Sequence, residues 1–560
     1  MGSTSGGRNK YINFRNKQRA NMSFFIVVMF FAVFGIIVFT EIFFIDEKEK
    51  GAGILVRHGS LNFHHGKDKI DYDNEFQDDD YISIRVGQAM MDTADIGAFL
   101  MGKSRIHVSN GIDNAPPFMA KVISENQLPP YPENFSISNG SWQNVSGSKY
   151  KFFVFSAYYD QRRNQRNIRI IAATKTRGPE RVWCRLWYRI IDGNSTVNIS
   201  RTVPAKIKVI RENWNLRYSA CFVMCPLRAN LTVPTAVSVV AKLKDSPTNM
   251  LHVINNINES NWKSNTLNNP PIGRFGVCVK PLHFDYNKEM EIMEFIELNR
   301  LLGVDHFTFY NHTIGPQVSC ILREYQSQGI VTLLPWKLAM VSQKEIRTEG
   351  LFAALNDCLY RSMYKFSHIL LIDLDEYIIP NYNETLPQLI DYLNHRLNTR
   401  TTGSFSFQNA FFYLQWDDDS EVYDFSDPIS SNLVTLKKTR RKTKLHPHKQ
   451  RSKYICRPEL VVEAGNHFVW EFIPGHGTLN VPADAAILHH YRICEFGGND
   501  CIKTSSTVDK TAYKYLQSLT RAVREQYDKL KYSCNLSQPK EPPTRVFHKI
   551  LSMLKNSQKR

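Results

Sequence analysis

From residue 272 onward the sequence predicts an α/β fold, because segments typical of strands alternate with segments typical of helices. Short apolar runs between polar or glycine residues indicate strands at 274–282, 304–311, 330–336 and 368–377. Segments with helical periodicity separate these runs, at 287–303, 315–329 and 349–366. This alternation favours a parallel sheet with right-handed crossovers, in which ligands bind at the carboxyl ends of the strands.

The fourth of these strands ends in acidic residues. The stretch HILLIDLDEYIIP, 368–380, changes from apolar residues to Asp373, Asp375 and Glu376. Carboxylates this close repel one another, and each is costly to bury without a partner. Strand residues two apart share a face, so we expect Asp373 and Asp375 to point together and Glu376, on the other face, to matter less. A hard cation such as Mn²⁺ or Mg²⁺ would neutralise the pair and also bind phosphates of a substrate.

An exposed loop is the alternative interpretation of an Asp-x-Asp pattern. The pattern is short, and acidic stretches at 71–73, 78–80 and 417–419 match it as well. Only 373–375 ends a strongly apolar strand within the α/β series, and the metal site is favoured there.

A later segment offers a further metal ligand. In AILHHYRICEF, 486–496, His489 and His490 follow another apolar run. Successive strand residues face opposite sides, so only one of the two is expected to reach the metal. An ordinary histidine of the core or the surface is the alternative for either residue.

The residues before the α/β region have a different pattern. Short runs of β-branched and aromatic residues between Gly, Asn and Pro breaks predict a small β-rich domain over 149–250, before a linker at 252–271. We expect a disulfide from Cys184 to Cys221 or Cys225 to stabilise this domain.

The N-terminal part predicts a membrane anchor. Residues 22–39 carry no charge, and the apolar run continues to Ile45, which is long enough to cross a bilayer as a helix. Five Lys or Arg residues precede it, so residues 1–21 are expected to be a cytoplasmic tail and 46–148 a stem on the other side. A cleaved signal peptide is the alternative interpretation of this run.

Cysteines and glycosylation sites agree with this placement. All ten cysteines follow the anchor, and so do ten Asn-x-Ser/Thr acceptor sites, as expected of a chain that enters the secretory pathway. We therefore expect most cysteines to form disulfides. The net charge of +17 favours anionic partners, but a lumenal position makes nucleic acid an unsuitable one.

The region from about 273 to 530 resembles glycosyltransferase family 92. The matching pieces are FGVCVKPLH, FIELNRLLGVDHFTFYN, AALNDCLYR, LIDLDEYIIP, KYICRPE and HHYR. The resemblance implies a Rossmann-like nucleotide-sugar-binding fold of the GT-A type over 272–530, with a C-terminal tail at 531–560. It also implies a metal-dependent galactosyltransferase that uses Mn²⁺ or Mg²⁺. One departure is Gly-Leu-Phe in RTEGLFAALNDC, where the family leads us to expect a Gln.

The same resemblance implies roles for single residues. Asp373 and Asp375 become the acids that meet the metal and the UDP ribose, and His490 becomes the late metal ligand. Lys453 and His467 become candidates for donor binding. Lys453 ends a tract at 437–453 that holds nine Lys or Arg and no acid. The tract is expected to be either a solvated loop, a lid that screens the UDP diphosphate, or a dock for acidic glycans.

The expected activity is that of a single-pass type II Golgi membrane enzyme. It would move galactose from UDP-galactose, with inversion, onto a glycan or glycoprotein acceptor, such as fucose on N-glycans. The general base remains open among several carboxylates, of which Glu463 and Glu495 are put forward as catalytic; the candidates are Asp417, Asp418, Glu463, Glu471 and Glu495. Aromatic residues at 411–416 are candidates for stacking on the acceptor. Two alternatives remain: a transferase for another UDP-sugar, and a non-catalytic, membrane-anchored glycan-binding protein.

Overall fold

The structure is a computed structural model that describes residues 125–132, 136–163, 165–192, 195–229, 231–257, 274–419, 427–494 and 500–540. The predicted tail, the anchor, most of the stem and Glu495 lie outside these residues. No helix in the described part of the chain is long and apolar enough to span a membrane. All described residues belong to one unit, which falls within Gln77–Arg560.

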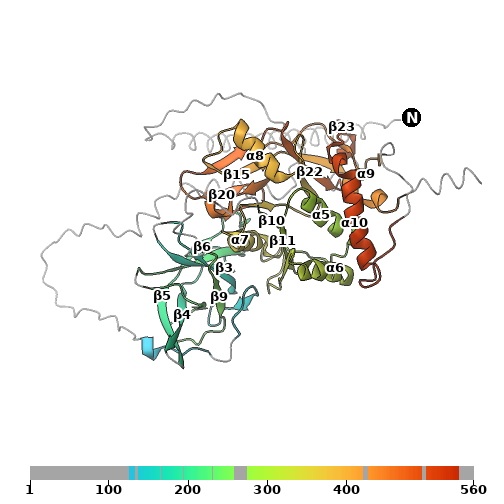
Figure 1. Ribbon diagram of the computed structural model, residues 1–560. Helices are drawn as coiled ribbons and strands as arrows, with labels where there is room; N and C mark the ends of the chain where they lie inside the picture. Colours follow the sequence, from blue (N-terminus) through green and yellow to red (C-terminus); the bar gives the residue numbers. More distant parts are fainter. Residues whose placement is uncertain are drawn as a thin grey trace, which may run out of the picture. The chain divides into compact units, whose positions relative to one another are not determined.

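The N-terminal part of this unit is a nine-stranded sheet, drawn in cyan to green in Figure 1. Its strands lie in the order β5-β4-β8-β9-β2-β3-β7-β6, with β1 paired to β2. A short 3₁₀ helix η1 precedes them, and the bounds are: η1 Glu125–Gln127, β1 Gln143–Asn144, β2 Phe153–Asp160, β3 Asn167–Lys175, β4 Trp183–Asp192, β5 Ser195–Pro204, β6 Lys206–Val209, β7 Tyr218–Pro226, β8 Ala236–Val240 and β9 Leu251–Ile254. The β-branched and aromatic runs of the sequence therefore do form strands here.

A disulfide joins two strands of this sheet. Cys184 of β4 is bonded to Cys225 of β7, so the structure selects one of the two partners that the sequence left open. Cys221, the other candidate, is a buried free thiol on β7. The bond links strands that are not neighbours in the sheet, and such a cross-link stabilises the fold chiefly by restricting the unfolded chain.

The second sheet begins with the predicted α/β series. β10, β11, β12 and β13 are parallel to one another, and helices α5, α6 and α7 connect them in the predicted order. Three further strands extend the sheet to the order β12-β11-β10-β13-β18-β15-β21, and β18 runs antiparallel to β13. The bounds of this series are: β10 Phe275–Cys278, α5 Glu289–Leu301, β11 His306–Asn311, α6 Pro316–Ser327, β12 Val331–Pro335, η2 Thr348–Gly350, α7 Leu351–Ser362 and β13 His368–Leu371.

Smaller sheets complete this part of the unit, drawn in yellow to red in Figure 1: β14-β22-β16, β17-β23 and β19-β20. The remaining elements are: β14 Glu376–Pro380, α8 Leu386–Arg396, β15 Thr402–Phe407, β16 Asn409–Tyr413, η3 Ser430–Asn432, α9 Val434–Lys437, β17 Arg440–Lys442, β18 Lys453–Cys456, η4 Pro458–Leu460, β19 Val461–Ala464, β20 Val469–Phe472, β21 Gly477–Asn480, β22 Ala486–Arg492, η5 Asp500–Lys503, β23 Ser506–Val508, η6 Thr511–Tyr515 and α10 Leu516–Leu530.

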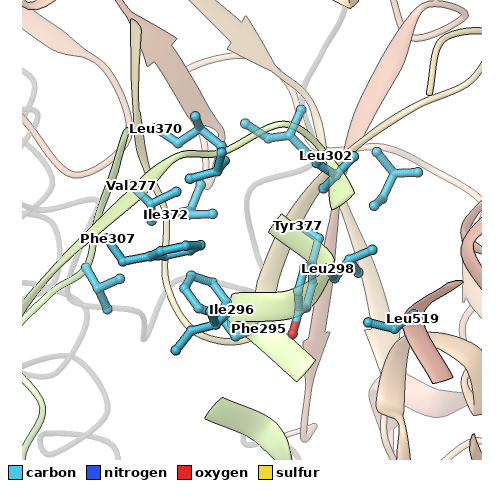
Figure 2. Close-up of a cluster of buried hydrophobic side chains, with 14 of the residues drawn as sticks. Val277, Phe295, Ile296, Leu298, Leu302, Phe307, Leu370, Ile372, Tyr377 and Leu519 are labelled. Atoms are coloured by element: carbon cyan, nitrogen blue, oxygen red, sulfur yellow. The ribbon is translucent and has the colours of Figure 1, made fainter. Parts of the chain in front are cut away.

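Helix α5 lies at the centre of the large hydrophobic core. All of its residues from 292 to 299 are buried, including the polar side chains of Glu294, Glu297 and Asn299. Figure 2 shows its Phe295, whose ring lies 6.1 Å from that of Phe307 on β11 and 5.8 Å from that of Tyr377 on β14. Each fully buried aromatic ring contributes about 1.5–3 kcal/mol to folding. This core fixes the position of the loop that joins β10 to α5.

Asp357 on α7 connects the N-terminal sheet to the α/β part. Its fully buried carboxylate accepts hydrogen bonds from Ser156 and, at 2.5 Å, Tyr158 of β2, from Tyr310 of β11 at 2.7 Å, and from Arg361 at 3.0 Å. Four donors from three elements satisfy a charge that would otherwise be costly to bury. These hydrogen bonds therefore stabilise the packing of the N-terminal sheet against the α/β part.

Three more disulfides lie in the α/β part: Cys278–Cys358, Cys320–Cys534 and Cys494–Cys501. With Cys184–Cys225 they pair eight of the ten cysteines, and Cys221 and Cys456 are free and buried. The prediction that most cysteines are paired is confirmed.

Candidate active site

The acidic stretch forms the turn between two strands. β13 ends at Leu371, β14 begins at Glu376, and Asp373 and Asp375 lie between them. The Glu376 carboxylate closes the turn by accepting a hydrogen bond from the Asp373 backbone N–H at 2.9 Å. The side chains of Asp373 and Asp375 are 25% and 40% exposed, whereas that of Glu376 is 2% exposed. The acids thus lie at the carboxyl end of β13 as predicted, but in a turn instead of along the strand.

The pairing of β14 with β22 brings His490 to these acids. Glu376 and His490 are partners in the antiparallel register. His490 Nε2 lies 3.3 Å from Asp375 Oδ2, and its Nδ1 lies 3.3 Å from Glu376 Oε1 and 3.0 Å from the Asn409 amide. Glu376 was expected to matter less than the two aspartates, but its carboxylate contacts both the acidic turn and His490.

His489 points to the other side of the same strand. It is fully buried, and its ring stacks on Phe412 with the centroids 4.5 Å apart. Burial lowers the pKa of His489 to about 4, which makes it a neutral residue of the core. Of the two histidines, His490 is the one beside the acids, and its role as a metal ligand stays a prediction.

Two lysines converge on Asp373. Its Oδ2 accepts hydrogen bonds from Lys280 Nζ at 2.8 Å and from Lys453 Nζ at 3.2 Å, whereas its buried Oδ1 has no hydrogen-bond partner in the described part of the chain. Burial raises the pKa of Asp373, but the two ammonium groups outweigh it and hold that pKa well below its usual value. Burial likewise raises the pKa of Asp375, and His490 lowers it further than burial raises it. Both acids are ionised at neutral pH.

Lys453 is buried beneath the acids. Its side chain is 2% exposed, and Nζ also contacts Asn466 Oδ1 at 3.0 Å and Glu376 Oε2 at 3.4 Å. Burial lowers the pKa of Lys453, but Asp373 and Glu376 more than reverse this effect. The Asn466 side chain lies between this lysine and His467, with its amide nitrogen 3.0 Å from His467 Nε2. The expectation that Lys453 belongs to a mobile lid over the donor is corrected: it is an internal counter-charge on β18.

A cavity of about 1010 Å³ opens beside the acids. Asp373, Asp375 and Lys280 form one part of its wall, and Asp418, Lys438 and Arg492 another. The first residues of α5 and the segment 537–540 close the remaining sides. Ligand-binding pockets usually measure about 300–1,000 Å³, so this cavity has room for a nucleotide-sugar together with part of an acceptor.

One of the carboxylates proposed as the general base lines this cavity, and others lie away from it. Asp418 lines it, and the exposed Asp417 does not. Glu463 is fully buried, with the Lys208 ammonium 2.8 Å away and a hydrogen bond from the Arg211 backbone N–H. Glu471 pairs with the same side of the N-terminal sheet, through Arg163, Lys208 and Arg211. This corrects the placement of Glu463 in the catalytic site: both glutamates hold the β19–β20 hairpin against the N-terminal sheet.

Some residues of the cavity wall were not identified from the sequence. They are Lys280, which follows β10, and three glutamates of α5: Glu289, Glu291 and Glu294. Burial raises the pKa of Glu294 to about 7, although Thr435 and the Val434 backbone N–H donate hydrogen bonds to it. Their position in the sequence could have identified them, because they all lie in or just after the loop at the carboxyl end of a predicted strand.

The residues present fit a divalent cation with few protein ligands. Across the ranges that the structure describes, no group of three or more His, Cys, Asp or Glu is arranged to hold a metal. Mg²⁺ and Mn²⁺ in phosphate-binding sites commonly use one or two protein ligands with water and substrate oxygens. Two ligands at right angles on such an ion lie about 3 Å apart, which is close to the 3.3 Å between Asp375 and His490. The partnerless Oδ1 of Asp373 offers another acceptor in the same turn.

Comparison with known proteins finds a family that is similar to this region. The model of glycosyltransferase family 92 matches residues 273–536. The β-1,4-galactosyltransferase galt-1 of Caenorhabditis elegans is 22% identical over 222 residues, which are 39% of this chain and 48% of that protein. The chain thus spans about half the length of this curated relative.

Solved structures show a more distant likeness. Glucosyl-3-phosphoglycerate synthase of Mycobacterium tuberculosis, in complex with Mn²⁺, UDP and glucosyl-3-phosphoglycerate, is 13% identical and covers 48% of this chain and 81% of its own, with a TM-score of 0.20. Staphylococcus aureus TarS 1–349 in complex with UDP is 9% identical, and the match covers 47% of this chain and 75% of the TarS chain, with a TM-score of 0.21. Similarity this low supports no assignment of residue roles. The family match, in contrast, spans the acids, both lysines and His490, and residues 273–536 of this chain are similar to glycosyltransferase family 92.

Proposed function

We propose that this protein is a metal-dependent hexosyltransferase that moves galactose from UDP-galactose onto a glycan acceptor with inversion. The observation that carries the proposal is the cluster of Asp373, Asp375 and His490 at the carboxyl end of β13, open to a cavity of about 1010 Å³. The family match supports sugar transfer, and the name of the C. elegans relative favours galactose.

Asp375 and His490 would hold the cation. A bound Mn²⁺ or Mg²⁺ supplies Lewis-acid stabilisation of the leaving diphosphate. His490 Nε2 faces Asp375, while Nδ1 accepts a hydrogen bond from the Asn409 amide at 3.0 Å, and this contact fixes the orientation of the ring. Asp373 stays ionised between two lysines, so its unpartnered Oδ1 can accept a hydrogen bond from a ribose hydroxyl or a water.

Asp418 is our candidate for the general base. Its carboxylate lines the cavity, is 37% exposed, and is fixed by Lys438 Nζ at 2.6 Å. The acceptor hydroxyl would attack the anomeric carbon from the face opposite the diphosphate, while its proton passes to Asp418. The bond from the anomeric carbon to the phosphate oxygen breaks at the same time, and its electron pair leaves with UDP.

The compartment is part of the proposal. Four disulfides within the described residues support folding in an oxidising lumen. A type II Golgi membrane protein would have the sheet and the cavity in that lumen, and the apolar run at 22–45 would be its anchor.

The test is a donor screen with the purified full-length protein in detergent. The protein is incubated with Mn²⁺, a panel of UDP-sugars and a glycan mixture, and both UDP release and labelled glycan are measured. We expect UDP-galactose to be used best and excess EDTA to stop transfer. Preference for another UDP-sugar would contradict the galactose assignment, and glycan binding without turnover of any donor would favour a non-catalytic protein.

A further inference from the structure

Two lysines share one oxygen of Asp373 but differ in their surroundings. Lys453 is 2% exposed and is held by Asp373, Glu376 and Asn466 together. Lys280 is 24% exposed and lines the cavity, and Asp373 is the acceptor of its hydrogen bond. Lys280 is therefore the lysine of this pair that is open to a ligand in the cavity, whereas Lys453 is held in place by its three partners.

We propose that Lys280 binds the diphosphate of the donor and meets the charge that develops on the leaving UDP, while Lys453 remains a fixed counter-charge. The inference rests on the proposed function, because it takes a nucleotide diphosphate as the ligand. It assigns donor binding to a residue that the sequence did not single out, in place of Lys453.

The position of Lys280 supports this role. It follows β10, whose carboxyl end lies beside that of β13 in the parallel sheet, and donors in such sheets bind outside these ends. Its ammonium lies 2.8 Å from Asp373, next to the pair of Asp375 and His490 that would hold the cation. A diphosphate bound to that cation would come within reach of a flexible lysine side chain at the cavity wall.

The charges of the cluster support an exchange of partners by Lys280. Three carboxylates, those of Asp373, Asp375 and Glu376, lie beside only two lysine ammonium groups, so the cluster suits a further cation. When the cation and the diphosphate are bound, Asp373 still has Lys453, and Lys280 can turn to a phosphate oxygen without leaving a buried acid unpaired. As the bond to the anomeric carbon breaks, a further negative charge appears on the β-phosphate oxygen, where a nearby ammonium is most useful.

The same loop offers a matched control. Lys288 also lines the cavity, but it is 68% exposed and pairs with Glu291 at 2.9 Å instead of with the acidic turn. Loss of its charge changes the cavity wall without touching Asp373. If the positive charge of the cavity wall acted only in general, loss of either lysine would weaken UDP binding. If Lys280 contacts the diphosphate, only the loss of Lys280 would weaken it.

The experiment compares Lys280→Met, Lys280→Arg and Lys288→Met in the full-length protein. Calorimetry measures the affinities for UDP and for uridine, each with Mn²⁺ and with EDTA. For Lys280→Met we expect UDP to bind about tenfold more weakly or worse, because a charge-assisted hydrogen bond is lost, and uridine to bind as in the wild type. We expect Lys280→Arg to keep most of the UDP affinity and Lys288→Met to keep all of it.

Steady-state rates provide a second readout. A contact that strengthens as charge develops on UDP lowers kcat more than it raises KM when it is removed. Wild-type UDP affinity and kcat in Lys280→Met would overturn the proposal, and so would an equal loss of uridine binding, which would show a role in structure alone. If the wild type binds no UDP at all, the proposed function fails and this inference fails with it.

Discussion

His490 Nε2 lies 3.3 Å from Asp375 Oδ2, although the two residues come from distant parts of the chain. The contact exists because β22 pairs with β14 in a register that places His490 opposite Glu376, the first residue after the acidic turn. An Asp and a His at this separation are in direct contact, and the same two atoms can share a divalent cation. The predictions below begin with this pair.

Asp375→Asn is expected to reduce sugar transfer at least about 100-fold and to leave the fold intact. The change keeps the size of the side chain but removes the charge that would hold the cation. Added Mn²⁺ with UDP should raise the melting temperature of the wild type and not that of the variant, because binding stabilises the folded state. Asp417→Asn, in an exposed acid outside the cavity wall, is the control. Transfer at the wild-type rate by Asp375→Asn would exclude the metal site.

His490→Gln and His489→Gln should fail in different ways. We expect His490→Gln to require about tenfold more Mn²⁺ or worse for half-maximal activity, since a ligand is lost. His489→Gln should keep the Mn²⁺ requirement but lower the free energy of unfolding by about 1–3 kcal/mol, because a ring packed on Phe412 is replaced by a buried amide. A Mn²⁺ titration of activity and a urea denaturation curve distinguish the two. The same Mn²⁺ dependence in both variants would contradict the assignment.

Asp418→Asn tests the general base. We expect kcat to fall about 100-fold to 10,000-fold, the usual contribution of general base catalysis, with little change in UDP affinity. The neighbouring Lys438 loses its ion pair with Asp418 in this variant, so the melting temperature is measured alongside the rate. The matched variant is Glu463→Gln, which removes a carboxylate that lies outside the cavity wall, between Lys208 and the Arg211 backbone. A larger rate loss in Glu463→Gln than in Asp418→Asn, at equal stability, would reverse the assignment.

Glu471 should give the folded state a measurable pH dependence. Burial raises the pKa of Glu471, but Lys208, Arg163 and Arg211 lower it to about 2. Because the folded pKa lies below the unfolded one, the stabilisation is complete above about pH 4.5 and is lost as the pH falls toward 2. The contribution is about 3 kcal/mol at most. Glu471→Gln should therefore destabilise the protein at pH 7 and flatten the loss of stability between pH 4.5 and 2, measured by urea denaturation. An unchanged pH profile in the variant would contradict the ion-pair cluster.

Local patterns in the sequence were enough to predict the α/β series and the position of its acids. Alternating apolar runs and helical periodicity are local patterns, so β10 to β13 and α5 to α7 could be predicted in order. The carboxyl end of β13 was identified as the site because buried carboxylates there need a counter-charge. The even number of cysteines after the apolar run at 22–45 predicted that most would pair, and eight of the ten do.

Which side chains contact one another could not be predicted from these local patterns. Lys453 looked like part of a mobile basic tract, but β18 pairs with β13 and buries its ammonium beneath Asp373. Glu463 was predicted to be catalytic, but it faces the N-terminal sheet. Lys280 was not predicted at the site, but it lines the cavity. Strand pairing and packing across long chain separations set these contacts, and no local pattern encodes them. Cys225 was selected over Cys221 in the same way, since a disulfide depends on how two strands are placed in space.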